Sequence, residues 1–403
     1  INKPNINIAG NDTLTGGVVV SQGSNKKNWT ATYTMRDQDD DTDAIEVDIL
    51  ELRDLAYNLA DNLASKTPTP DIIYDKTRPI FGNVTISSPT NDNSNAGLGV
   101  SAGERATIGD DILITFTITE ANGIITPVVV LETLNSPTIN ADNAPIYTAT
   151  FSSIPDFGDA GPLEFAITAT DYAGNQRSFY QNNLVTDNVK FDGDAPIISI
   201  AEADLTIVSG GTNSAYAKVN DVVTLTFKIT SNLDEIQDPT IRIAGDMCSN
   251  AAANAGNSVT PTYTDADGSG SWNSGEIWSA SYTMLNTDDD VSTSGCTNVR
   301  FQIDVKDLAG NSATPVTHAD VVTNVVFDRT APQVASEAAA LKIWTDAGTS
   351  SSHAKSGDEV KVQVKFNEVT SKPTMSIASK AATVANSDDG GITWVGSYTF
   401  LSA

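Results

Sequence analysis

One stretch of the chain has the residue types and the spacing of a calcium-binding loop. Between positions 265 and 276, oxygen-bearing residues recur at every second position and a glutamate closes the stretch. Calcium takes six to eight oxygen ligands, a glycine at the sixth position makes the turn, and the last glutamate can bind through both oxygens. The sequence therefore predicts calcium as a cofactor, with these ligands: Asp265, Asp267, Ser269, Ser271 (through its carbonyl), Asn273 and Glu276.

The alternative for this stretch is an acidic hairpin tip, rich in glycine and serine, that binds no ion. The helices that usually flank such a loop are absent, because Tyr263 precedes it and the strand-like Ile277-Trp278 follows it. Two other acidic clusters are weaker candidates for calcium, since crowded carboxylates attract a cation but are more often solvated loops. They are Asp37, Asp39, Asp41 and Asp43 near the start, and Asp288 to Asp290 at the same place in a later repeat.

Composition excludes several classes of function. The 403 residues include 51 acidic and 23 basic ones, which gives a net charge of −28. Such a chain is unsuited to nucleic acid or to an anionic membrane surface, both of which need a basic footprint. The chain has only two histidines and two cysteines. These are too few for a cluster of zinc ligands, and they make a histidine-dependent catalytic triad improbable. No apolar run approaches the ~20 residues of a membrane-spanning helix, and no nucleophile–base pair stands out, so we expect no enzymatic activity and no transmembrane segment here.

Two short signatures repeat at a fixed distance. The first is Asp-x-Ala-Gly-Asn, with a degenerate copy in which Tyr57 replaces the glycine, and the second is Asp-x-x-x-Pro. A constant 21 residues separates the first Asp of one signature from the Asp of the other: Asp54 and Asp75, Asp171 and Asp192, Asp307 and Asp328. Three identical spacings indicate an internal tandem repeat.

The sequence of each repeat unit predicts a set of short strands. One strand opens with an aspartate and alternates apolar residues, as in Asp110-x-Ile112-x-Ile114, which lines one face of a strand. An aromatic strand, such as Trp278 to Tyr282, recurs in four places. About seven such strands without helical periodicity predict an all-β chain of tandem immunoglobulin-like β-sandwiches in an elongated array. The expected copies are 1–75 (N-terminal strands missing), 76–192, 193–328 (with the calcium-loop insertion) and 329–403 (C-terminal strands missing).

These motifs together resemble the immunoglobulin-like repeats of large bacterial and archaeal cell-surface proteins, including adhesins and surface-layer subunits. The resemblance covers the whole chain and rests on the junction, the aspartate-opened strand, the aromatic strand and the Asp-x-Ala-Gly-Asn turn. Tyr57, in place of the turn glycine, and Arg78, in place of the alanine before proline, depart from the pattern. Because a tyrosine at positive φ is strained, we expect the first copy's turn to differ from the others.

Several motifs keep two interpretations. The Asp-x-Ala-Gly-Asn turn is explained by backbone geometry, with metal binding as the alternative, and the junction aspartate could contribute to calcium between copies. Cys248 and Cys296 lie in two extended loops of the third copy, which predicts a disulfide and an oxidising compartment, with buried free thiols as the alternative. The aromatic strands suggest core packing rather than a sugar platform. Sequons at Asn11, Asn28 and Asn83 are possible glycosylation sites.

The leading functional hypothesis is a non-enzymatic structural protein of the prokaryotic cell surface. It would be a segment of a surface-layer or sheath array, stabilised by calcium and self-associating into a lattice or filament outside the cell. One alternative is the stalk of a large calcium-dependent adhesin. Another is a polysaccharide-binding accessory module of a secreted enzyme.

Overall fold

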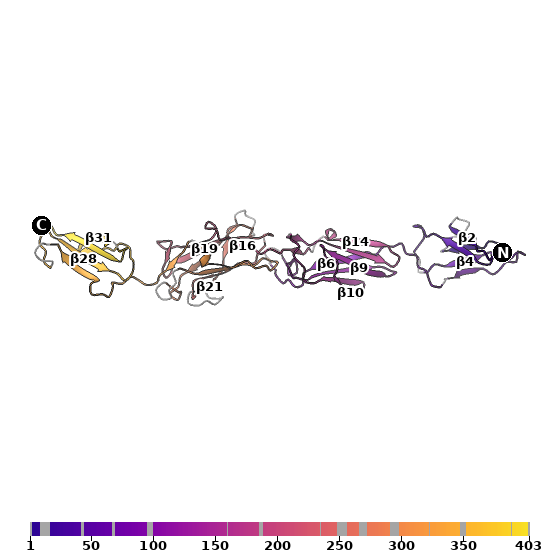
Figure 1. Ribbon diagram of the computed structural model, residues 1–403, viewed down its shortest axis with the longest axis horizontal. Helices are drawn as coiled ribbons and strands as arrows, with labels where there is room; N and C mark the ends of the chain where they lie inside the picture. The colour runs from indigo at the N-terminus through magenta and orange to yellow at the C-terminus, as the bar shows by residue number, and fades with distance from the viewer. Residues whose placement is uncertain are drawn as a thin grey trace.

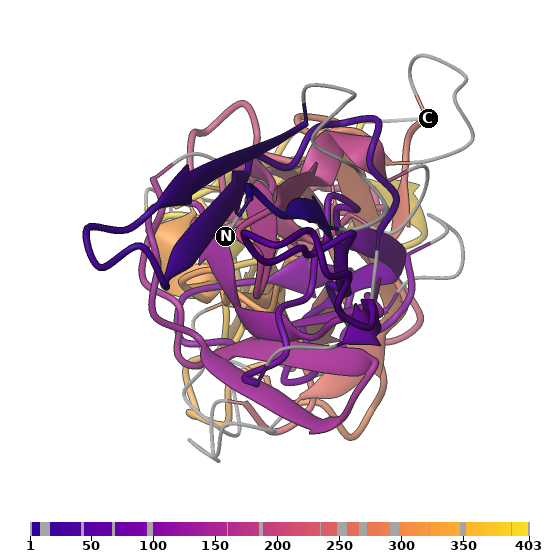
Figure 2. The same ribbon diagram turned by 90° about the vertical axis from the view of Figure 1, so that its right-hand side faces the viewer.

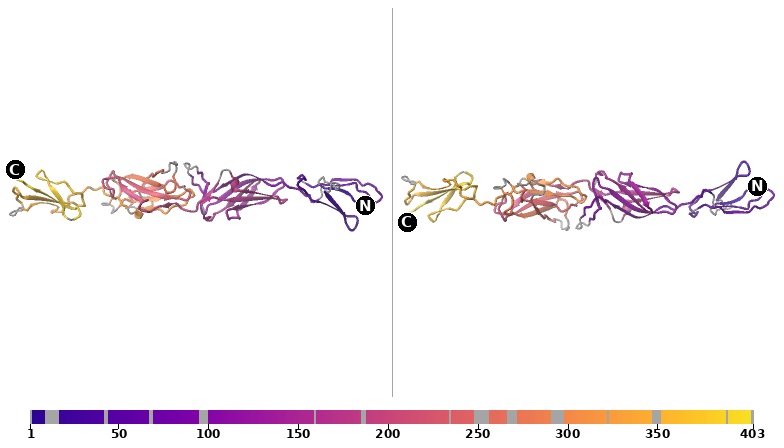
Figure 3. Two further views of the ribbon diagram at one scale, coloured as in Figure 1. Left: turned by 90° about the horizontal axis from the view of Figure 1, so that it is seen from above. Right: turned by 90° about the horizontal axis from the view of Figure 1, so that it is seen from below.

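The chain forms four β-bodies in a row. The computed structural model describes residues 2–8, 17–41, 44–66, 69–94, 100–158, 160–184, 188–233, 235–247, 256–265, 272–290, 298–321, 323–346, 352–387 and 389–401. Figures 1 and 3 show the bodies following one another along one axis, with the two termini at opposite ends. Viewed along that axis in Figure 2, the bodies lie behind one another. The fold is all-β, as the sequence predicts, and we keep the four expected ranges as copies 1 to 4.

Copy 2 is a two-sheet sandwich. Its elements are β6 (Ile80–Ser87), β7 (Arg105–Ala106), β8 (Ile112–Thr119), β9 (Ile124–Leu131), β10 (Thr138–Asn143), β11 (Ile146–Phe151), β12 (Gly161–Pro162), β13 (Phe165–Asp171), β14 (Gln176–Tyr180), the 3-10 helix η2 (Gln181–Asn183) and β15 (Lys190–Phe191). One sheet has the order β10-β11-β8-β6 and the other β14-β13-β9. In a small third sheet, β12-β15-β7, strand β7 runs parallel to β15.

The core of copy 2 follows from strict alternation along its strands. Ile112, Ile114 and Phe116 on β8 are fully buried, whereas the residues between them are half-buried. From the other sheet, Leu131 and Ile167 are equally buried in the same cluster. Each such side chain contributes about 1.5–3 kcal/mol relative to an exposed one, so this interior stabilises the sandwich.

Copy 3 repeats the arrangement. Its elements are β16 (Ile197–Ile198), β17 (Thr206–Ser209), β18 (Tyr216–Ala217), β19 (Val222–Thr230), β20 (Thr240–Ile243), β21 (Asn257–Val259), β22 (Thr262–Tyr263), β23 (Ile277–Thr283), β24 (Phe301–Asp304), β25 (Val316–Thr317), the 3-10 helix η3 (His318–Asp320) and β26 (Val326–Phe327). Strands β16-β19-β23-β22 form one sheet, β17 also pairs with β19, and β21-β20-β24-β25 form the other. Strand β18 runs parallel to β26, as β7 does to β15.

In the part of the chain that the structure describes, copies 1 and 4 contain fewer strands than copies 2 and 3. Copy 1 has sheets β1-β4-β5 and β2-β3, and copy 4 has β27-β28-β32-β31 and β29-β30. The strands are β1 (Asn5–Ile8), β2 (Val18–Gln22), β3 (Trp29–Tyr33), β4 (Val47–Leu50), β5 (Leu63–Lys66), β27 (Leu341–Thr345), β28 (Glu359–Lys365), β29 (Ser376–Ile377), β30 (Lys380–Ala381), β31 (Thr383–Asn386) and β32 (Thr393–Thr399). Every residue of β28 is only half-buried, in contrast to the alternation of its counterpart β8.

The aromatic strands pack in the interior, as predicted. Tyr147, Trp278 and Trp394 are 9%, 4% and 8% exposed. In Figure 1, β19 and β16 mark copy 3, and β6 and β14 mark copy 2. Among the described residues, no helix is long and apolar enough to cross a membrane.

Candidate functional site

The two ends of the predicted calcium loop lie opposite each other. The Thr264 N–H donates to the Ile277 carbonyl at 2.9 Å, which sets Asp265 and Glu276 at the mouth of the loop. The Asn273 N–H donates to the Glu276 Oε2 atom at 3.0 Å. Hard carboxylate and amide oxygens held at a hairpin mouth suit calcium. The other three ligands, Asp267, Ser269 and Ser271, lie outside the described residues, so the calcium assignment stays a prediction.

A tryptophan anchors this loop in the core of copy 3, which the sequence did not indicate. Trp272 is 6% exposed, and its ring centre lies 6.4 Å from that of Trp278. Tyr263, which precedes the loop, lies 5.1 Å from Trp278 on another side. The C-terminal end of the loop is therefore anchored in the sandwich interior through Trp272. Within the described part of the chain, no group of three or more His, Cys, Asp or Glu side chains is arranged to hold a metal.

The acidic cluster of copy 1 contains a clamp on the linker to copy 2. The Tyr33 hydroxyl donates to Asp39 Oδ1 at 2.8 Å, and the Arg36 N–H donates to Asp39 Oδ2 at 2.7 Å. The Lys76 ammonium donates to the carbonyls of Asp37 and Asp39. We call Tyr33, Asp39 and Lys76 the clamp of copy 1. A protein cation thus stands among the predicted calcium ligands.

Another member of that cluster also holds the linker. Asp41 accepts hydrogen bonds from the Thr77 hydroxyl and from the Lys76 N–H, and these lower the pKa of Asp41. Asp43, the fourth predicted ligand, lies outside the described residues. Calcium in this cluster remains an untested prediction.

Copy 3 has the same clamp at the equivalent positions. The Tyr282 hydroxyl donates to Asp288 Oδ1 at 3.1 Å, and the Leu285 N–H donates to Asp288 Oδ2 at 2.7 Å. Arg329 follows the junction aspartate as Lys76 does, and it donates to the Asn286 carbonyl. Burial and the neighbouring Asp288 raise the pKa of Tyr282, which keeps the hydroxyl a donor.

Arg329 also forms an ion pair at the third junction. Its Nε lies 2.9 Å from Asp290 Oδ2, whose side chain is 0% exposed. The basic residue of the linker therefore neutralises a buried carboxylate, which would otherwise be costly to bury.

Copy 2 replaces every member of this clamp. Phe151 stands in place of the tyrosine, Phe157 in place of the aspartate and Gly193 in place of the basic residue. Phe157 packs edge-on against Phe191 at 5.1 Å between ring centres. A Cβ atom at Gly193 would lie 3.2 Å from the Phe191 ring and 3.3 Å from Asp156 Oδ1, so a side chain there would require Phe191 or Asp156 to shift by a few tenths of an ångström.

The two repeated signatures meet at the copy junctions. The Asn175 side-chain amide donates to the Asp75 carbonyl at 3.0 Å, and the Asn311 amide donates to the Asp192 carbonyl at 2.8 Å. Within each turn, the same amide also donates to the first aspartate, Asp171 or Asp307. The Asp-x-Ala-Gly-Asn turn therefore ties its own copy to the linker that enters it.

The expectation that the first copy's turn differs is wrong. Tyr57 adopts φ 69°, the left-handed conformation that glycine adopts at Gly174 with φ 95°. Asn58 donates to Asp54 through both its N–H (2.9 Å) and its side-chain amide (2.8 Å), as in the other turns. These hydrogen bonds, with the Tyr57 N–H on the Asp54 carbonyl, offset the ~1–3 kcal/mol cost of a non-glycine residue at this φ.

At the second junction, the turn of copy 3 inserts between groups of copy 2. The Asn91 amide donates to the Ala309 carbonyl at 2.8 Å, and the Thr107 hydroxyl donates to Asn311 Oδ1. The Gln237 amide of copy 3 donates to Asn93 Oδ1 at 2.7 Å. We call Asn91, Asn93 and Thr107 the socket, and the turn at 307–311 the plug.

Burial separates this turn from its two counterparts. Leu308 in the plug is 0% exposed, whereas the equivalent Tyr172 and Leu55 are 72% and 81% exposed. Burial also raises the pKa of Asp307 to about 6, although hydrogen bonds from Asn311 act in the other direction. At the exposed turn, hydrogen bonds from Asn58 lower the pKa of Asp54.

A buried ion pair closes the second junction on another side. Arg105 of copy 2 donates to both carboxylate oxygens of Glu235 in copy 3, with Nη2 to Oε1 at 2.6 Å. Their side chains are 6% and 13% exposed, and Lys190 lies 3.4 Å from Glu235. Burial raises the pKa of Glu235, but the Arg105 hydrogen bond and charge outweigh burial, so the net change is a lowered pKa.

The first junction has a polar cavity instead. It measures about 300 Å³ and is lined in part by Asp41, Asp75 and Glu120. Asp75 is 7% exposed, and its Oδ2 atom has no hydrogen-bond partner, whereas Oδ1 accepts from the Thr77 N–H. Unpaired buried carboxylate oxygens are costly, and the three carboxylates outnumber the one guanidinium on the wall, that of Arg78, so the lining is acidic and favours a cation.

The equivalent place at the third junction brings two acids together. Burial raises the pKa of Glu368, and the charge of Asp328 adds to the effect. The Oε1 atom of Glu368 is buried without a hydrogen-bond partner. A cation there would compensate both carboxylates.

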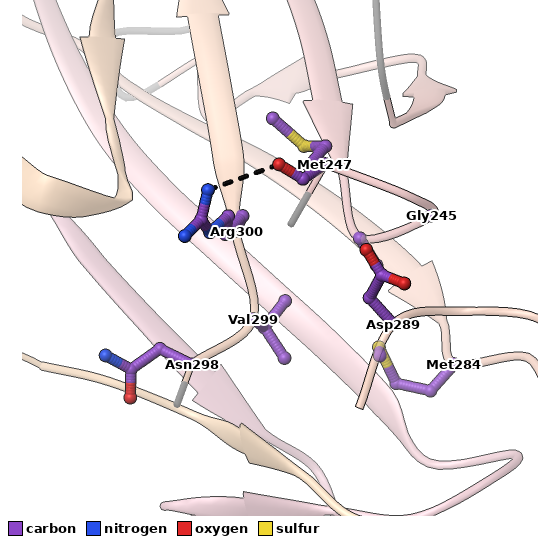
Figure 4. A pocket seen from close by; sticks show the side chains of 8 residues that line it. Gly245, Met247, Met284, Asp289, Asn298, Val299 and Arg300 are labelled. Atoms are coloured by element: carbon purple, nitrogen blue, oxygen red, sulfur yellow. Dashed lines mark hydrogen bonds between the residues drawn. The ribbon is translucent and has the colours of Figure 1, made fainter. Parts of the chain in front are cut away.

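A pocket beside the copy 3 clamp is too small for a ligand. Figure 4 shows the Arg300 guanidinium donating to the Met247 carbonyl at 3.2 Å, with Met284 and Asp289 on the opposite wall. The cavity offers about 10 Å³, which is room for at most one water molecule.

The remaining predicted sites are placed as follows. Asn28 and Asn83 are exposed and accessible to modification, whereas Asn11 lies outside the described residues. Cys248 and Cys296 also lie outside them, so the disulfide stays a prediction.

No protein-family model matches the chain, and no curated protein sequence matches it. Among solved structures, it is similar to a Ca2+-stabilized adhesin that helps an Antarctic bacterium reach out and bind ice. The identity is 15% over 99% of this chain and 82% of that chain, with a TM-score of 0.40. It is similar to a 1.5-MDa bacterial ice-binding adhesin at 12% identity, over 81% of this chain and 88% of that chain, with a TM-score of 0.37. These likenesses concern the fold alone.

Proposed function

We propose that this chain is a calcium-stabilised, non-enzymatic spacer segment of an extracellular, cell-surface protein. The observation that carries the proposal is the single row of sandwiches with termini at opposite ends, joined by clamped linkers (Figure 1). Such a row converts chain length into reach, because the copies follow one another along one axis. This favours the stalk interpretation over the surface layer that leads in the sequence analysis.

The clamps supply the first support for a spacer. Lys76 and Arg329 each hold the linker against the copy that precedes it. The turn amides of Asn175 and Asn311 hold the linker against the copy that follows. The first linker is held from both sides in this way, and the other two are each held from one side by these groups, so each linker has fewer conformations to explore than a free one.

Calcium is supported by two different kinds of site. At the loop of copy 3, Asp265 and Glu276 stand at the mouth of a hairpin of suitable sequence. At the first junction, Asp41, Asp75 and Glu120 line a polar cavity, and the Oδ2 atom of Asp75 is buried without a hydrogen-bond partner. The net charge of −28 further favours cation binding and keeps such a rod soluble through self-repulsion.

The test is the shape of the full chain in solution with millimolar calcium and with chelator. Small-angle scattering should give an extended rod with calcium and a smaller radius of gyration with chelator. Magnesium at the same ionic strength controls for screening. An unchanged scattering profile would overturn the calcium-dependent part, and a compact particle in calcium would overturn the spacer itself. Lattice or filament assembly by electron microscopy would restore the surface-layer alternative, for which self-association is required.

The loop assignment needs its own test. Glu276→Gln should weaken calcium binding by titration calorimetry, because one charge and the bidentate geometry are lost. Glu359→Gln, on a strand of copy 4 far from the loop in sequence, is the matched control. Equal calcium heats for wild type and both variants would remove the loop from the proposal.

A further inference from the structure

We propose that copies 2 and 3 form one rigid body, and that the chain bends at the first and third junctions. The inference goes beyond the proposed function, because it follows from protein–protein contacts at the second junction and needs no metal ion. It divides the row into a stiff central pair with a hinged copy at each end.

The contacts at the first and second junctions end on different parts of the chain. At the first junction, the hydrogen bonds of the clamp end on the linker residues Lys76 and Thr77. At the second junction, groups of the two sandwiches bind each other directly, as Asn91 does with Ala309 and Asn93 with Gln237. A contact on the linker restrains one copy, whereas direct contacts between sandwiches restrain their relative orientation.

Water is excluded from the second junction. Leu308 and Ala309 in the plug are 0% and 3% exposed, and Asn91 in the socket is 5% exposed. Any tilt that withdraws the plug exposes the leucine and separates buried polar partners. Both changes oppose bending, because buried donors and acceptors are costly to leave unpaired.

The ion pair is a second contact between copies 2 and 3, separate from the plug. Arg105 and Glu235 are joined by two hydrogen bonds from the guanidinium and are largely buried. A two-point attachment resists rotation about either point alone. Buried pairs are also screened little by salt, so this attachment should persist at the ionic strength of seawater.

Copy 2 has an aromatic contact in place of the polar clamp of copies 1 and 3. Phe157 against Phe191 places aromatic packing where copies 1 and 3 have a hydroxyl, a carboxylate and a basic side chain. This contact contains no charge to be screened or exchanged for an ion. The strand that leads into the second linker is therefore held by packing, and the charges that this junction does contain, Arg105 and Glu235, are largely buried.

The full chain can be tested by spin-label distance measurements, with labels on non-canonical residues so that both cysteines stay untouched. Labels replace exposed Thr138 in copy 2, Thr240 in copy 3 and Lys380 in copy 4. In chelator, the 138–240 distance distribution should be narrow and the 240–380 distribution clearly broader. Equal widths at both junctions would overturn the proposal.

A matched pair of variants separates the plug from general instability. Leu308→Asp should broaden the 138–240 distribution, because a carboxylate does not remain in the socket. Tyr172→Asp changes the equivalent, exposed position of copy 2 and should leave that distribution narrow. Circular dichroism confirms that both variants fold. If Leu308→Asp unfolds copy 3, Arg105→Gln with the same labels serves instead, and an unchanged narrow distribution in the folded variant would contradict the rigid body.

Discussion

The first and second junctions use the same two sequence signatures and produce different joints. At both, a turn asparagine binds the carbonyl of the junction aspartate, Asp75 or Asp192. At the first, the clamp is polar and the neighbouring turn is exposed. At the second, aromatic packing replaces the clamp and the turn is buried in a socket. The repeat therefore fixes where copies join, and residues outside the signatures fix how firmly.

The substitutions that distinguish the joints are consistent with one another. Tyrosine, aspartate and a basic residue occur together in copies 1 and 3, and two phenylalanines and a glycine occur together in copy 2. The basic residue lies 37 residues beyond the aspartate in copy 1, and a single exchange would leave a buried hydroxyl or charge without its partner. We infer that each set functions as a unit.

We expect the largest effect from a substitution that breaks the ion pair of the second junction. Arg105→Ala should destabilise the joint by about 3–5 kcal/mol, because Glu235 is left as a buried charge without its main partner. Calorimetry should show copies 2 and 3 unfolding at lower temperature. The double variant Arg105→Met, Glu235→Leu should recover much of the loss, and a double variant no better than Arg105→Ala would argue against an ionic cause.

The next largest effect is a difference in stability between substitutions in the plug and in its exposed counterpart. Leu308→Ala removes a fully buried side chain and should cost about 2–5 kcal/mol. Leu55→Ala, at the equivalent position of copy 1, should change stability by less than about 0.5 kcal/mol. Urea unfolding followed by tryptophan fluorescence measures both. Similar losses in the two variants would mean that the socket adds nothing to the stability of the turn.

The two turns should also respond to pH in opposite directions. Asp307 in the plug has its pKa raised to about 6, so its contribution is present below the unfolded value near 4 and is lost as the pH rises through 6. This amounts to about 3 kcal/mol. Asp54 has a lowered pKa, so its contribution is present above about 4 and is lost as the pH falls through the folded value. Carboxyl carbon-13 NMR titration of both residues measures the difference, and coincident midpoints would contradict it.

A smaller effect concerns the polar clamp. Tyr282→Phe removes one hydrogen bond to Asp288 and should cost about 0.5–1.5 kcal/mol. The reciprocal change, Phe151→Tyr, should also destabilise, because Phe157 offers no acceptor for the new hydroxyl. Thermal unfolding checks both variants. A stabilising Phe151→Tyr would show that the apolar clamp tolerates a polar group and that the two sets are not exclusive.

The smallest effect is at Tyr57. Tyr57→Gly should relieve the strain at positive φ and stabilise copy 1 by less than about 1 kcal/mol, since the flexible glycine loses more entropy on folding. Hydrogen exchange of the Asn58 amide reports this locally. Gly174→Ala in copy 2, where the same φ is required, should do the opposite.

The sequence was sufficient for the strands and the turns, because both depend on local patterns. Alternation along β8 and β19 and the Asp–Asn turns were readable from residue types alone. The clamp could not be predicted from the sequence, because Tyr33, Asp39 and Lys76 are brought together only by folding. The acidic residues around Asp39 suggested a bound metal ion instead. The socket was missed because Asn91 and Thr107 lie in segments without periodicity. Leu308 was missed because a leucine in a turn gives no sign of whether another copy covers it.

The parallel pairs β7–β15 and β18–β26 determine how a pulled rod would fail. The Asp192 N–H donates to the Ala106 carbonyl, and the Asp328 N–H donates to the Ala217 carbonyl, both at 2.9 Å. Tension along the row pulls β15 and β26 lengthwise past their neighbours, so their hydrogen bonds are loaded together rather than peeled one by one. Forced unfolding depends on the unfolding rate and not on equilibrium stability. Under load, copies 2 and 3 are therefore each held by the strand that leads out of them, close to the linker that transmits the force.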